Sequence, residues 1–436
     1  MTLLETAEFR RDPFPFYDVL RREQPLSFGV VLPGWMLTRY VDVASVLSDK
    51  RFSSRRVPED APLPTGLEHL HSMMREGRRF RALWVLHSDA PQHTRLRRLV
   101  TKAFTPRAVE ASRPKIREIV RALLEPLSDR PQFDVIADFA TPLPALVLCE
   151  LLRLPTIDWR ELRRLTDEIV APAPYIGSDA ARQIERTHIA QQELKHWVEG
   201  ILKARRQSPG PDILSALITA SENEDRLTAQ ELTAMTVLLL TAGNEPTTHL
   251  VGNALVTLLT HRATDAFRAA GARQTAIEEL LRYESPSQFL TRRATADIEM
   301  HARRIPAGSI VALALNSANR DPEVFRHADQ LDLSRTDAHR HLSFGHGAHH
   351  CIGAALARVI AEVALSALVE LPPLELAIDV PTWRPGTSVR GLDALPVRFV
   401  RRSATGASRK IDHPEVLDRR GPNLARRSHE GRFRCP

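Results

Sequence analysis

The chain is poor in cysteine: its 436 residues include only Cys149, Cys351 and Cys435, which lie far apart in the sequence. Three scattered thiols cannot form a disulfide framework, and none belongs to a Cys-x-x-Cys pair of the kind that holds structural zinc. A run of about 18 apolar residues is also missing, which excludes a helix spanning a bilayer. Residues 1–8 lack the basic and apolar segments of a secretory signal, so we expect a cytoplasmic protein.

A broad excess of one charge is missing as well. The formal net charge is +7, but residues 402–436 hold nine Lys and Arg against four Asp and Glu, and the remainder has 51 basic and 49 acidic residues. A nearly balanced body does not suit a nucleic-acid partner, and we expect none. Segment 402–436 is rich in Arg, Ser, Gly and Pro with little apolar periodicity. We expect a disordered tail there; a docking or membrane-surface arm is the alternative.

The pattern of the remaining sequence is mainly helical. Hydrophobic residues make up 43% and charged residues 26%, as in a globular protein with a large core, and the length alone suggests two or three domains. Short β-rich stretches are predicted at residues 35–40 and 294–315. Helical periodicity covers six segments: residues 15–23, 97–102, 108–127, 143–152, 159–169 and 182–205. We therefore expect a mainly α fold with a small β region.

Cys351 lies in the glycine-rich segment Phe344-Gly-His-Gly-Ala-His-His-Cys-Ile-Gly353. Its glycines allow positive φ and close backbone approach: Gly345, Gly347 and Gly353. A helix expected to begin near Ile352 would point unpaired N–H groups at the sulfur and stabilise a thiolate before any metal binds. The pattern indicates a single thiolate offered to a metal. A zinc-binding His/Cys tract and a buried structural cysteine are the alternatives.

A long helix is predicted from the capping box Thr228-Ala-Gln-Glu231 to about Thr260, roughly 50 Å. Pro246 lies at its centre, where proline costs about 3 kcal/mol and removes the N–H that would pair with the Ala242 carbonyl. The series of backbone hydrogen bonds along the helix should be interrupted there, which leaves room for a ligand or water. A kink imposed by packing is the alternative. An acid beside the break, Glu245, favours the functional interpretation.

Two charged pairs follow helical spacing. Glu279 and Arg282 are three residues apart, which taken alone indicates a solvated ion pair. His93 and Arg97 are four residues apart near a helix start, where they could hold a carboxylate or form a basic face in water.

The spacing F-x-x-G-x-x-x-C-x-G, filled by Phe344, Gly347, Cys351 and Gly353, resembles the haem-binding signature of the cytochrome P-450 family. Further motifs occur in the family's order: Asp12-Pro13, Thr38-Arg-Tyr40, Asn319-Arg-Asp-Pro322 and Gly391-Leu-Asp-Ala-Leu-Pro-Val-Arg-Phe399. The resemblance covers about residues 10–400 and implies one domain, residues 1–401, followed by the tail. It also implies the family's mainly α prism with a small β region.

The cofactor that the resemblance implies is haem b (iron protoporphyrin IX), buried between the central helix and the cysteine loop, with Cys351 as the axial iron ligand. It implies six residues that contact the haem: His93, Arg97, Arg293, His349, Phe344 and Gly353. Glu279 and Arg282 match the family's buried E-x-x-R pair, and Arg335 is the candidate for a third charge joining it.

The activity that the resemblance implies is insertion of one oxygen atom from dioxygen into a mostly apolar small molecule. Ala242 and Glu245 match the A-G-x-[DE]-T pattern of the central helix, but Pro246 replaces its threonine. We expect Ala242, Glu245 and Thr247 to be the catalytic residues, with a water at the Ala242 carbonyl acting together with Glu245. A substrate hydroxyl or a shifted Thr247 are alternatives. Pro246 could also mark peroxide-driven oxygenation or oxidative coupling, and a non-catalytic haem sensor is a further hypothesis.

Partners follow from the same resemblance. The sequence has no reductase domain or flavin motif, so electrons from NAD(P)H would arrive through an external ferredoxin and its reductase. An acidic ferredoxin would bind near His346, His350 and Arg358. We expect a monomer. The substrate, a secondary metabolite, terpenoid, polyketide or fatty-acid-like molecule, would contact four segments: about residues 56–84, 170–183, 287–291 and 388–389.

Overall fold

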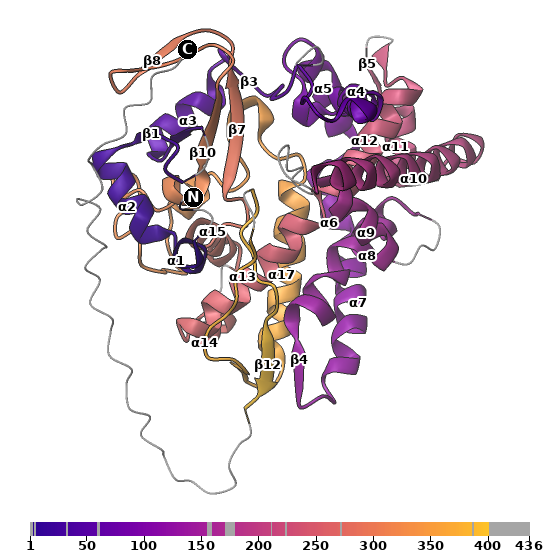
Figure 1. Ribbon diagram of the computed structural model, residues 1–436. Helices are drawn as coiled ribbons and strands as arrows, with labels where there is room; N and C mark the ends of the chain where they lie inside the picture. Colours follow the sequence, from indigo (N-terminus) through magenta and orange to yellow (C-terminus); the bar gives the residue numbers. More distant parts are fainter. Residues whose placement is uncertain are drawn as a thin grey trace, which may run out of the picture.

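The computed structural model describes residues 3, 6–31, 34–58, 62–154, 159–170, 179–210, 212–222, 225–270, 273–385 and 388–400 (Figure 1). The predicted tail, residues 402–436, lies outside the described residues.

Helices dominate, as predicted. They are α1 (Ala7–Arg11), α2 (Phe14–Glu23), α3 (Tyr40–Ser48), α4 (His71–Ala82), α5 (Gln92–Ala103), α6 (Pro106–Ala111), α7 (Arg113–Leu124), α8 (Pro142–Leu151), α9 (Trp159–Val170), α10 (Ala180–Gln207), α11 (Ile213–Thr219), α12 (Ala229–Ala242), α13 (Glu245–Thr260), α14 (Thr264–Ala269), α15 (Arg273–Tyr283), α16 (Leu315–Ala318) and α17 (Ala354–Glu370). All six predicted helical segments are confirmed, although residues 108–127 are divided among α6, α7 and a short 3-10 turn.

The strands are short. They are β1 (Leu26–Phe28), β2 (Trp35–Leu37), β3 (Phe52–Ser53), β4 (Gln132–Asp134), β5 (Ser221–Glu222), β6 (Asp225–Arg226), β7 (Phe289–Ala294), β8 (Ile298–Met300), β9 (Arg303–Ile305), β10 (Ile310–Ala314), β11 (Leu374–Leu376) and β12 (Pro396–Phe399). Both β-rich predictions are confirmed in position. Their boundaries were wrong, because Tyr40 begins a helix and the second stretch begins five residues early, with β7.

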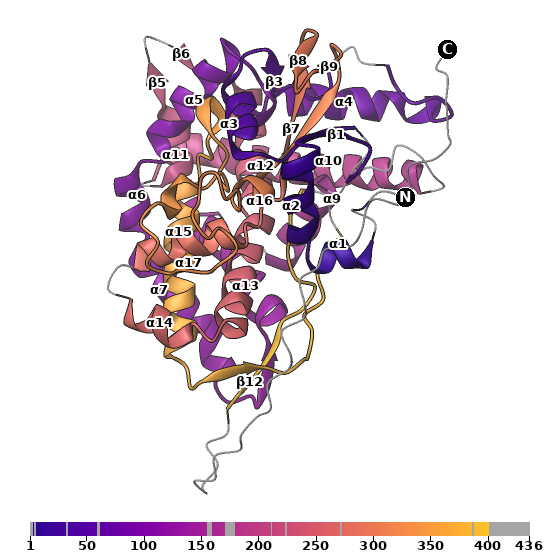
Figure 2. The ribbon, with the colours of Figure 1, turned by 90° about the vertical axis from the view of Figure 1, so that its left-hand side faces the viewer.

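The largest sheet has the order β1-β2-β10-β7-β3. Strand β10 runs parallel to β2 and antiparallel to β7, with Ala312 opposite both Met36 and Thr291. A second sheet has the order β11-β12-β4, and β5-β6 and β8-β9 are hairpins. The large sheet lies on one side of the molecule and helices α7–α12 on the other, with β12 at the lower end (Figures 1 and 2).

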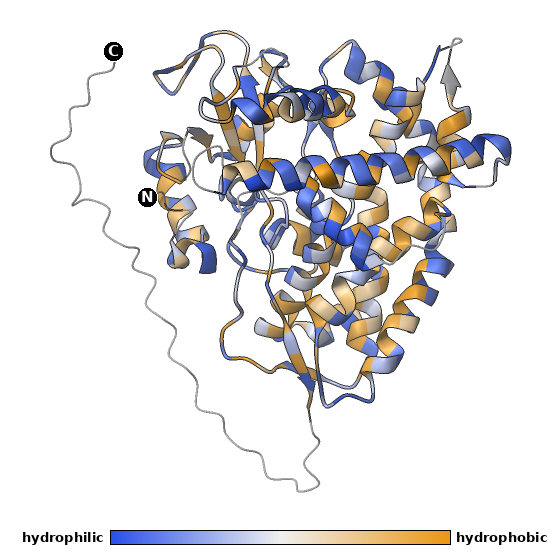
Figure 3. Cartoon of the chain, turned by 45° about the vertical axis from the view of Figure 1, so that its right-hand side comes forward, coloured by the Kyte–Doolittle hydropathy of each residue, from blue (hydrophilic) through white to orange (hydrophobic). Residues whose placement is uncertain are grey.

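The main hydrophobic core lies among the helices. Its buried residues come chiefly from α7, α8, α12, α13, α15 and α17, and α13 contacts α17 directly. Hydrophobic residues concentrate in the middle of the molecule, whereas the long outer helix α10 carries many hydrophilic residues (Figure 3). Helices α12 and α13 together form the predicted central helix, buried on most sides.

The central helix breaks where the sequence predicts it. Thr228 and Glu231 form the capping box, with Thr228 Oγ1 accepting from Glu231 N at 3.2 Å. The helix ends at Ala242 and resumes at Glu245. Pro246 is therefore the second residue of α13. In the first turn of a helix the N–H groups have no hydrogen-bond partner within the helix, so the missing N–H of proline breaks no hydrogen bond. The expected cost of an interior proline is avoided because a new helix begins there.

Candidate active site

The cysteine loop has the close turns that its glycines predict. Cys351 N donates to Phe344 O at 2.8 Å, which closes the loop. Gly345 and Gly347 have φ of +73° and +68°, and a Cβ on Gly347 would lie 3.1 Å from Leu47 O. The expectation for Gly353 was wrong: its φ is −83°, and it precedes the first turn of α17 as the N-cap. A Cβ on Gly353 would instead lie 3.9 Å from Cys351 Sγ.

The sulfur of Cys351 receives hydrogen bonds from the backbone N–H groups of Gly353 and Ala354, at the start of α17. Burial nevertheless raises the pKa of the Cys351 thiol, against the smaller lowering effects of these groups and of Arg97 and Arg358. The expectation of a stabilised thiolate in the metal-free chain was therefore wrong, because desolvation outweighs the N–H groups. The side chain keeps an accessible face, so a cation bound there can provide the missing stabilisation.

Cys149 is the contrasting case. Burial alone raises the pKa of its thiol to about 11, and no basic group or helix N-terminus opposes that effect. Among the described residues, no three His, Cys, Asp or Glu side chains converge on a point where they could hold a metal ion. The zinc hypothesis therefore has no donor set within the described residues, and Cys351 remains the predicted single sulfur ligand.

Two imidazoles form a buried group beside the cysteine loop. The rings of His93 on α5 and His349 have centroids 3.9 Å apart. Burial, followed by the nearby His93 and Arg292, lowers the pKa of His349 to about 3, and burial also lowers the pKa of His93. Both rings are therefore neutral near pH 7. His93 Nε2 is buried and has no hydrogen-bond partner among the described residues, which suits a ligand oxygen.

Arginine side chains complete this group, but one of them differs from the prediction. Arg97 Nη2 donates to His350 O at 2.6 Å, which ties α5 to the cysteine loop. Arg292 is buried and electrostatically coupled to both His93 and His349. Arg293 faces away and donates to Arg55 O at 3.1 Å, so the structure does not bring it to the group. Successive side chains along β7 point to opposite faces of the sheet, so choosing Arg293 in place of its neighbour Arg292 selects the wrong face.

Behind the loop, the predicted charged triad is present and buried. Arg282 donates to both Glu279 oxygens at 2.7 and 2.8 Å, and Arg335 Nε lies 3.1 Å from Glu279 Oε2. Glu279 and Arg282 are fully buried, which corrects the solvated interpretation of the pair alone and confirms Arg335 as its third member. Asn319 Oδ1 accepts from Leu342 N at 2.7 Å, which ties the same region to the start of the cysteine loop.

The helix break presents a polar group inside the core. Ala242 is exposed although its neighbours Thr241 and Asn244 are buried, so the helix opens onto an accessible space at this point. Both side-chain amide atoms of Asn244 are buried without a partner among the described residues. Thr247 is also buried. These groups suit a bound water or ligand at the break.

Glu245 is engaged by a residue that the sequence did not indicate. Its Oε1 accepts from Arg384 Nη1 at 3.1 Å, and the same nitrogen lies 2.9 Å from His249 Nε2. Burial raises the pKa of Glu245, whereas Arg384 acts in the opposite direction. Arg384 comes from the segment before β12, 139 residues along the chain, and no local pattern links the two.

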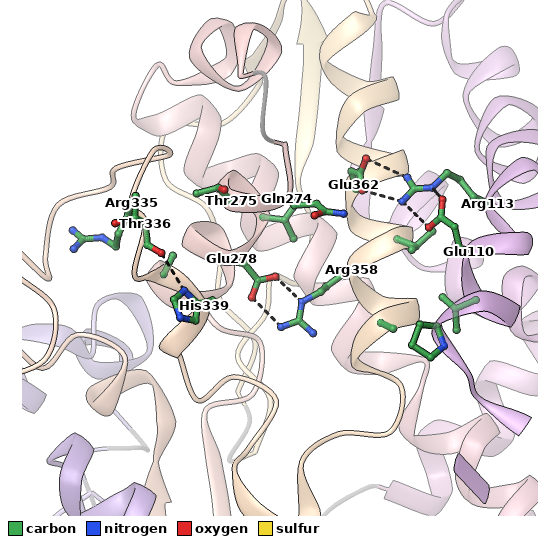
Figure 4. Close-up of a pocket in the computed structure, with 16 residues that line it drawn as sticks. Glu110, Arg113, Gln274, Thr275, Glu278, Arg335, Thr336, His339, Arg358 and Glu362 are labelled. Atoms are coloured by element: carbon green, nitrogen blue, oxygen red, sulfur yellow. Dashed lines mark hydrogen bonds and ion pairs between the residues drawn. The ribbon is translucent and has the colours of Figure 1, made fainter. Parts of the chain in front are cut away.

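A pocket of about 440 Å³ lies between α6, α7, α15 and α17 (Figure 4). Its charges are compensated in pairs: Arg358 binds Glu278, and Arg113 binds Glu110 and Glu362. Arg358 also stacks on Phe344, 4.5 Å from the ring centroid. The predicted partner-binding residue Arg358 is thus paired with Glu278, with 34% of its side chain exposed, whereas His346 and His350 are exposed and have no such ion pair among the described residues.

The helical fold, a single accessible cysteine sulfur at a helix start and a broken central helix together define a haem-thiolate type of protein. The sequence model of the family described as Cytochrome P450 matches residues 273–377. The chain is 35% identical to the biotin biosynthesis cytochrome P450 of Bacillus subtilis (strain 168), covering 90% of this chain and 98% of that protein. It is 37% identical to 6-deoxyerythronolide B hydroxylase of Saccharopolyspora erythraea, covering 91% and 98%.

Comparison with solved structures indicates the same family. P450BioI in complex with hexadec-9Z-enoic acid ligated acyl carrier protein superimposes with a TM-score of 0.81 at 33% identity, covering 90% of this chain and 99% of that one. The chain therefore belongs to the cytochrome P450 family, and it is a monooxygenase, as its relatives are named. Among the described residues, none of the helices combines the length and apolar character needed to cross a membrane.

Proposed function

We propose that the protein binds haem b through Cys351 and inserts one oxygen atom from dioxygen into a mostly apolar small molecule. The observation that carries the proposal is the accessible Cys351 sulfur, held by two backbone N–H groups beside the neutral pair His93 and His349. The residues present fit haem, because the unpartnered His93 Nε2, the buried Arg292 and the half-buried Arg97 suit its propionates. Bound haem supplies the activation of dioxygen.

In this proposal Cys351 binds the iron. His93, Arg97, His349 and Arg292 hold the propionates, with Arg292 taking the place expected for Arg293. Phe344 and Gly353 would contact the cofactor beside the sulfur; the support is that the backbone of each is hydrogen-bonded to Cys351. The test is the absorption spectrum of the reduced carbon monoxide complex. The thiolate band should be present in the wild type and absent from Cys351→Ser, and a wild-type protein purified without haem would refute the proposal.

Proton supply is proposed to use Glu245 together with a water at the Ala242 carbonyl. Pro246 has no N–H to donate to that carbonyl, and Asn244 and Thr247 provide buried polar side chains at the same helix break. Glu245→Gln should release more hydrogen peroxide per NAD(P)H consumed, because a residue that cannot carry a proton slows the productive route. Thr247→Val tests whether the shifted threonine contributes; an unchanged ratio assigns the role to water and Glu245.

The substrate is proposed to be fatty-acyl or polyketide-like. The support is the set of similar proteins, whose names concern biotin biosynthesis, an acyl carrier protein and a macrolide precursor. A screen for substrate-induced haem spectral shifts should compare free hexadec-9Z-enoic acid, the same acyl chain on acyl carrier protein, and macrolactones. Shifts only with small aromatic compounds would refute this substrate class.

Electrons are proposed to come from NAD(P)H through a cytoplasmic ferredoxin and its reductase. Three exposed basic residues lie on α5 and α6: Arg98, Lys102 and Arg107. Helix α5 is tied to the His350 backbone through Arg97. The charge reversals Lys102→Glu and Arg107→Glu should weaken turnover at limiting ferredoxin, and raised ionic strength should do the same to the wild type. Arg398→Glu, on the distant strand β12, is the matched control (Figure 2).

Pro246 favours a second candidate, peroxide-driven oxygenation or oxidative coupling, because the usual hydroxyl is absent at that position. Product analysis with hydrogen peroxide alone, against ferredoxin with dioxygen, separates the two candidates. Higher yield with peroxide would favour the second.

A further inference from the structure

A hairpin near the end of the fold reaches back to the central helix. Trp383 and Leu392 form an antiparallel bridge, and Arg384 N donates to Gly391 O at 2.9 Å. Asn253 on α13 donates from Nδ2 to Arg390 O at 2.9 Å, which fixes the hairpin against that helix. The hairpin therefore places both Arg384 and Gly391 against α13, one helical turn before Asn253.

His249 occupies that position and depends on the glycine. A Cβ on Gly391 would lie only 2.0 Å from His249 Nδ1, so the ring fits only because residue 391 has no side chain. His249 is buried, and its Nε2 accepts from Arg384 Nη1 at 2.9 Å. Because arginine can only donate, this contact assigns the ring proton to Nδ1, which has no partner among the described residues. His249 is thus a neutral anchor for the guanidinium.

The same nitrogen, Arg384 Nη1, binds Glu245 Oε1 at 3.1 Å. The two hydrogens of Arg384 Nη1 therefore allow one hydrogen bond to Glu245, at the helix break, and one to His249, one turn further along α13. The ion pair is partly accessible, with 35% of the Arg384 side chain and 23% of the Glu245 side chain exposed. Glu245 consequently has contact with solvent while its neighbours Asn244 and Thr247 are buried.

We propose that Arg384 is a positioning residue for proton supply: anchored on His249, it holds the Glu245 carboxylate at the helix break and controls its uptake and release of a proton. This inference rests on the proposed role of Glu245. Protonation forms an O–H bond on Glu245 and removes its negative charge, which leaves a net positive charge on Arg384. Arg384 keeps its bond to His249 and lies 3.8 Å from Asp393 Oδ1. The other charged groups facing Glu245 are Arg163 and Asp167 on α9, which are paired with each other at 2.9 Å.

The first test is an infrared titration of the Glu245 carboxyl band in the haem-loaded protein, with the band identified by its loss in Glu245→Gln. Arg384→Gln should raise the pKa of Glu245, because the positive charge that favours the carboxylate is gone. Arg384→Lys should restore part of the effect. Arg398→Gln, which removes an exposed pair with Glu375, is the matched control and should change nothing.

Two variants test the anchor without touching Arg384 or Glu245. His249→Leu removes the acceptor, and Gly391→Ala forces the ring away. Both should change the Glu245 titration in the same direction as Arg384→Gln, and to a smaller extent. An unchanged Glu245 titration in Arg384→Gln would overturn the inference.

The second test measures hydrogen peroxide released per NADPH consumed, with a surrogate ferredoxin system and free hexadec-9Z-enoic acid as the probe. Arg384→Gln should change the ratio by roughly two- to fivefold, the range expected for a partly exposed ion pair. If Glu245→Gln leaves the ratio unchanged, the proposed role of Glu245 fails, while the infrared titration still decides whether Arg384 positions the carboxylate. If Glu245→Gln changes the ratio and Arg384→Gln does not, only the inference fails.

Discussion

The buried triad behind the cysteine loop allows a prediction whose size follows from the structure. Glu279 accepts four hydrogen bonds, two from Arg282, one from Arg335 Nε and one from Asp332 N, at distances of 2.7 to 3.3 Å. Glu279→Gln removes the carboxylate that is fully buried against Arg282 and turns an amide N–H₂ toward these donors. Among the described residues, the fully buried Arg282 then keeps only backbone carbonyl partners, whereas Arg335 keeps carbonyls and the Asp337 carboxylate at 3.7 Å. We expect a loss of about 3–5 kcal/mol in the free energy of unfolding.

The assay is urea-induced unfolding followed by tryptophan fluorescence, with haem retention measured in parallel. Glu362→Gln is the matched control, because Glu362 pairs with Arg113 at 3.1 Å in a partly exposed position and Arg113 keeps Glu110 as a second partner. The control should lose less than about 1 kcal/mol. If the two substitutions lowered the free energy of unfolding equally, this would refute the reasoning that burial decides how much these ion pairs contribute to stability.

Other predictions address single positions. Arg292→Gln should lower the haem content of the purified protein, whereas Arg293→Gln should leave it near the wild-type value; the reverse order would restore the residue expected from sequence. Gly347→Ala should destabilise the fold by about 1–2 kcal/mol, because its φ is +68° and Leu47 O is close, as thermal unfolding can measure. Burial lowers the pKa of His87 and His249 to about 3, so the unfolded chain binds more protons and stability should fall as the pH drops from about 6.5 towards 3. His87→Asn should flatten this dependence in urea titrations, and an unchanged slope would contradict it.

Local features of the sequence predicted much of the fold. Helical periodicity, the capping box at Thr228 and the proline at residue 246 depend on interactions within a few residues, and each was placed correctly. The turn before Cys351 is similar, because Gly345 and Gly347 need no distant partner to adopt positive φ. The strands were placed less well, since β7 is defined by pairing with β10 rather than by its own pattern.

The structure brings together the pairs whose spacing in sequence maps directly to spacing on a helix, His93 with Arg97 and Glu279 with Arg282. Prediction failed for the direction of the Arg293 side chain, because only the register of β7 against its neighbours decides which arginine points inward. It also failed for the thiol of Cys351, whose pKa depends on how many protein atoms surround it.

By itself the sequence determined the family, the cysteine proposed as the single sulfur ligand and the position of the helix break, because these are local and carried by residue type. Only the tertiary structure decided that Arg358 is already paired with Glu278 and that Arg384 and His249 hold Glu245. These contacts join segments 80 to 139 residues apart. A charge acquires its partner and its pKa from the packing of such distant segments, which no spacing along the chain specifies.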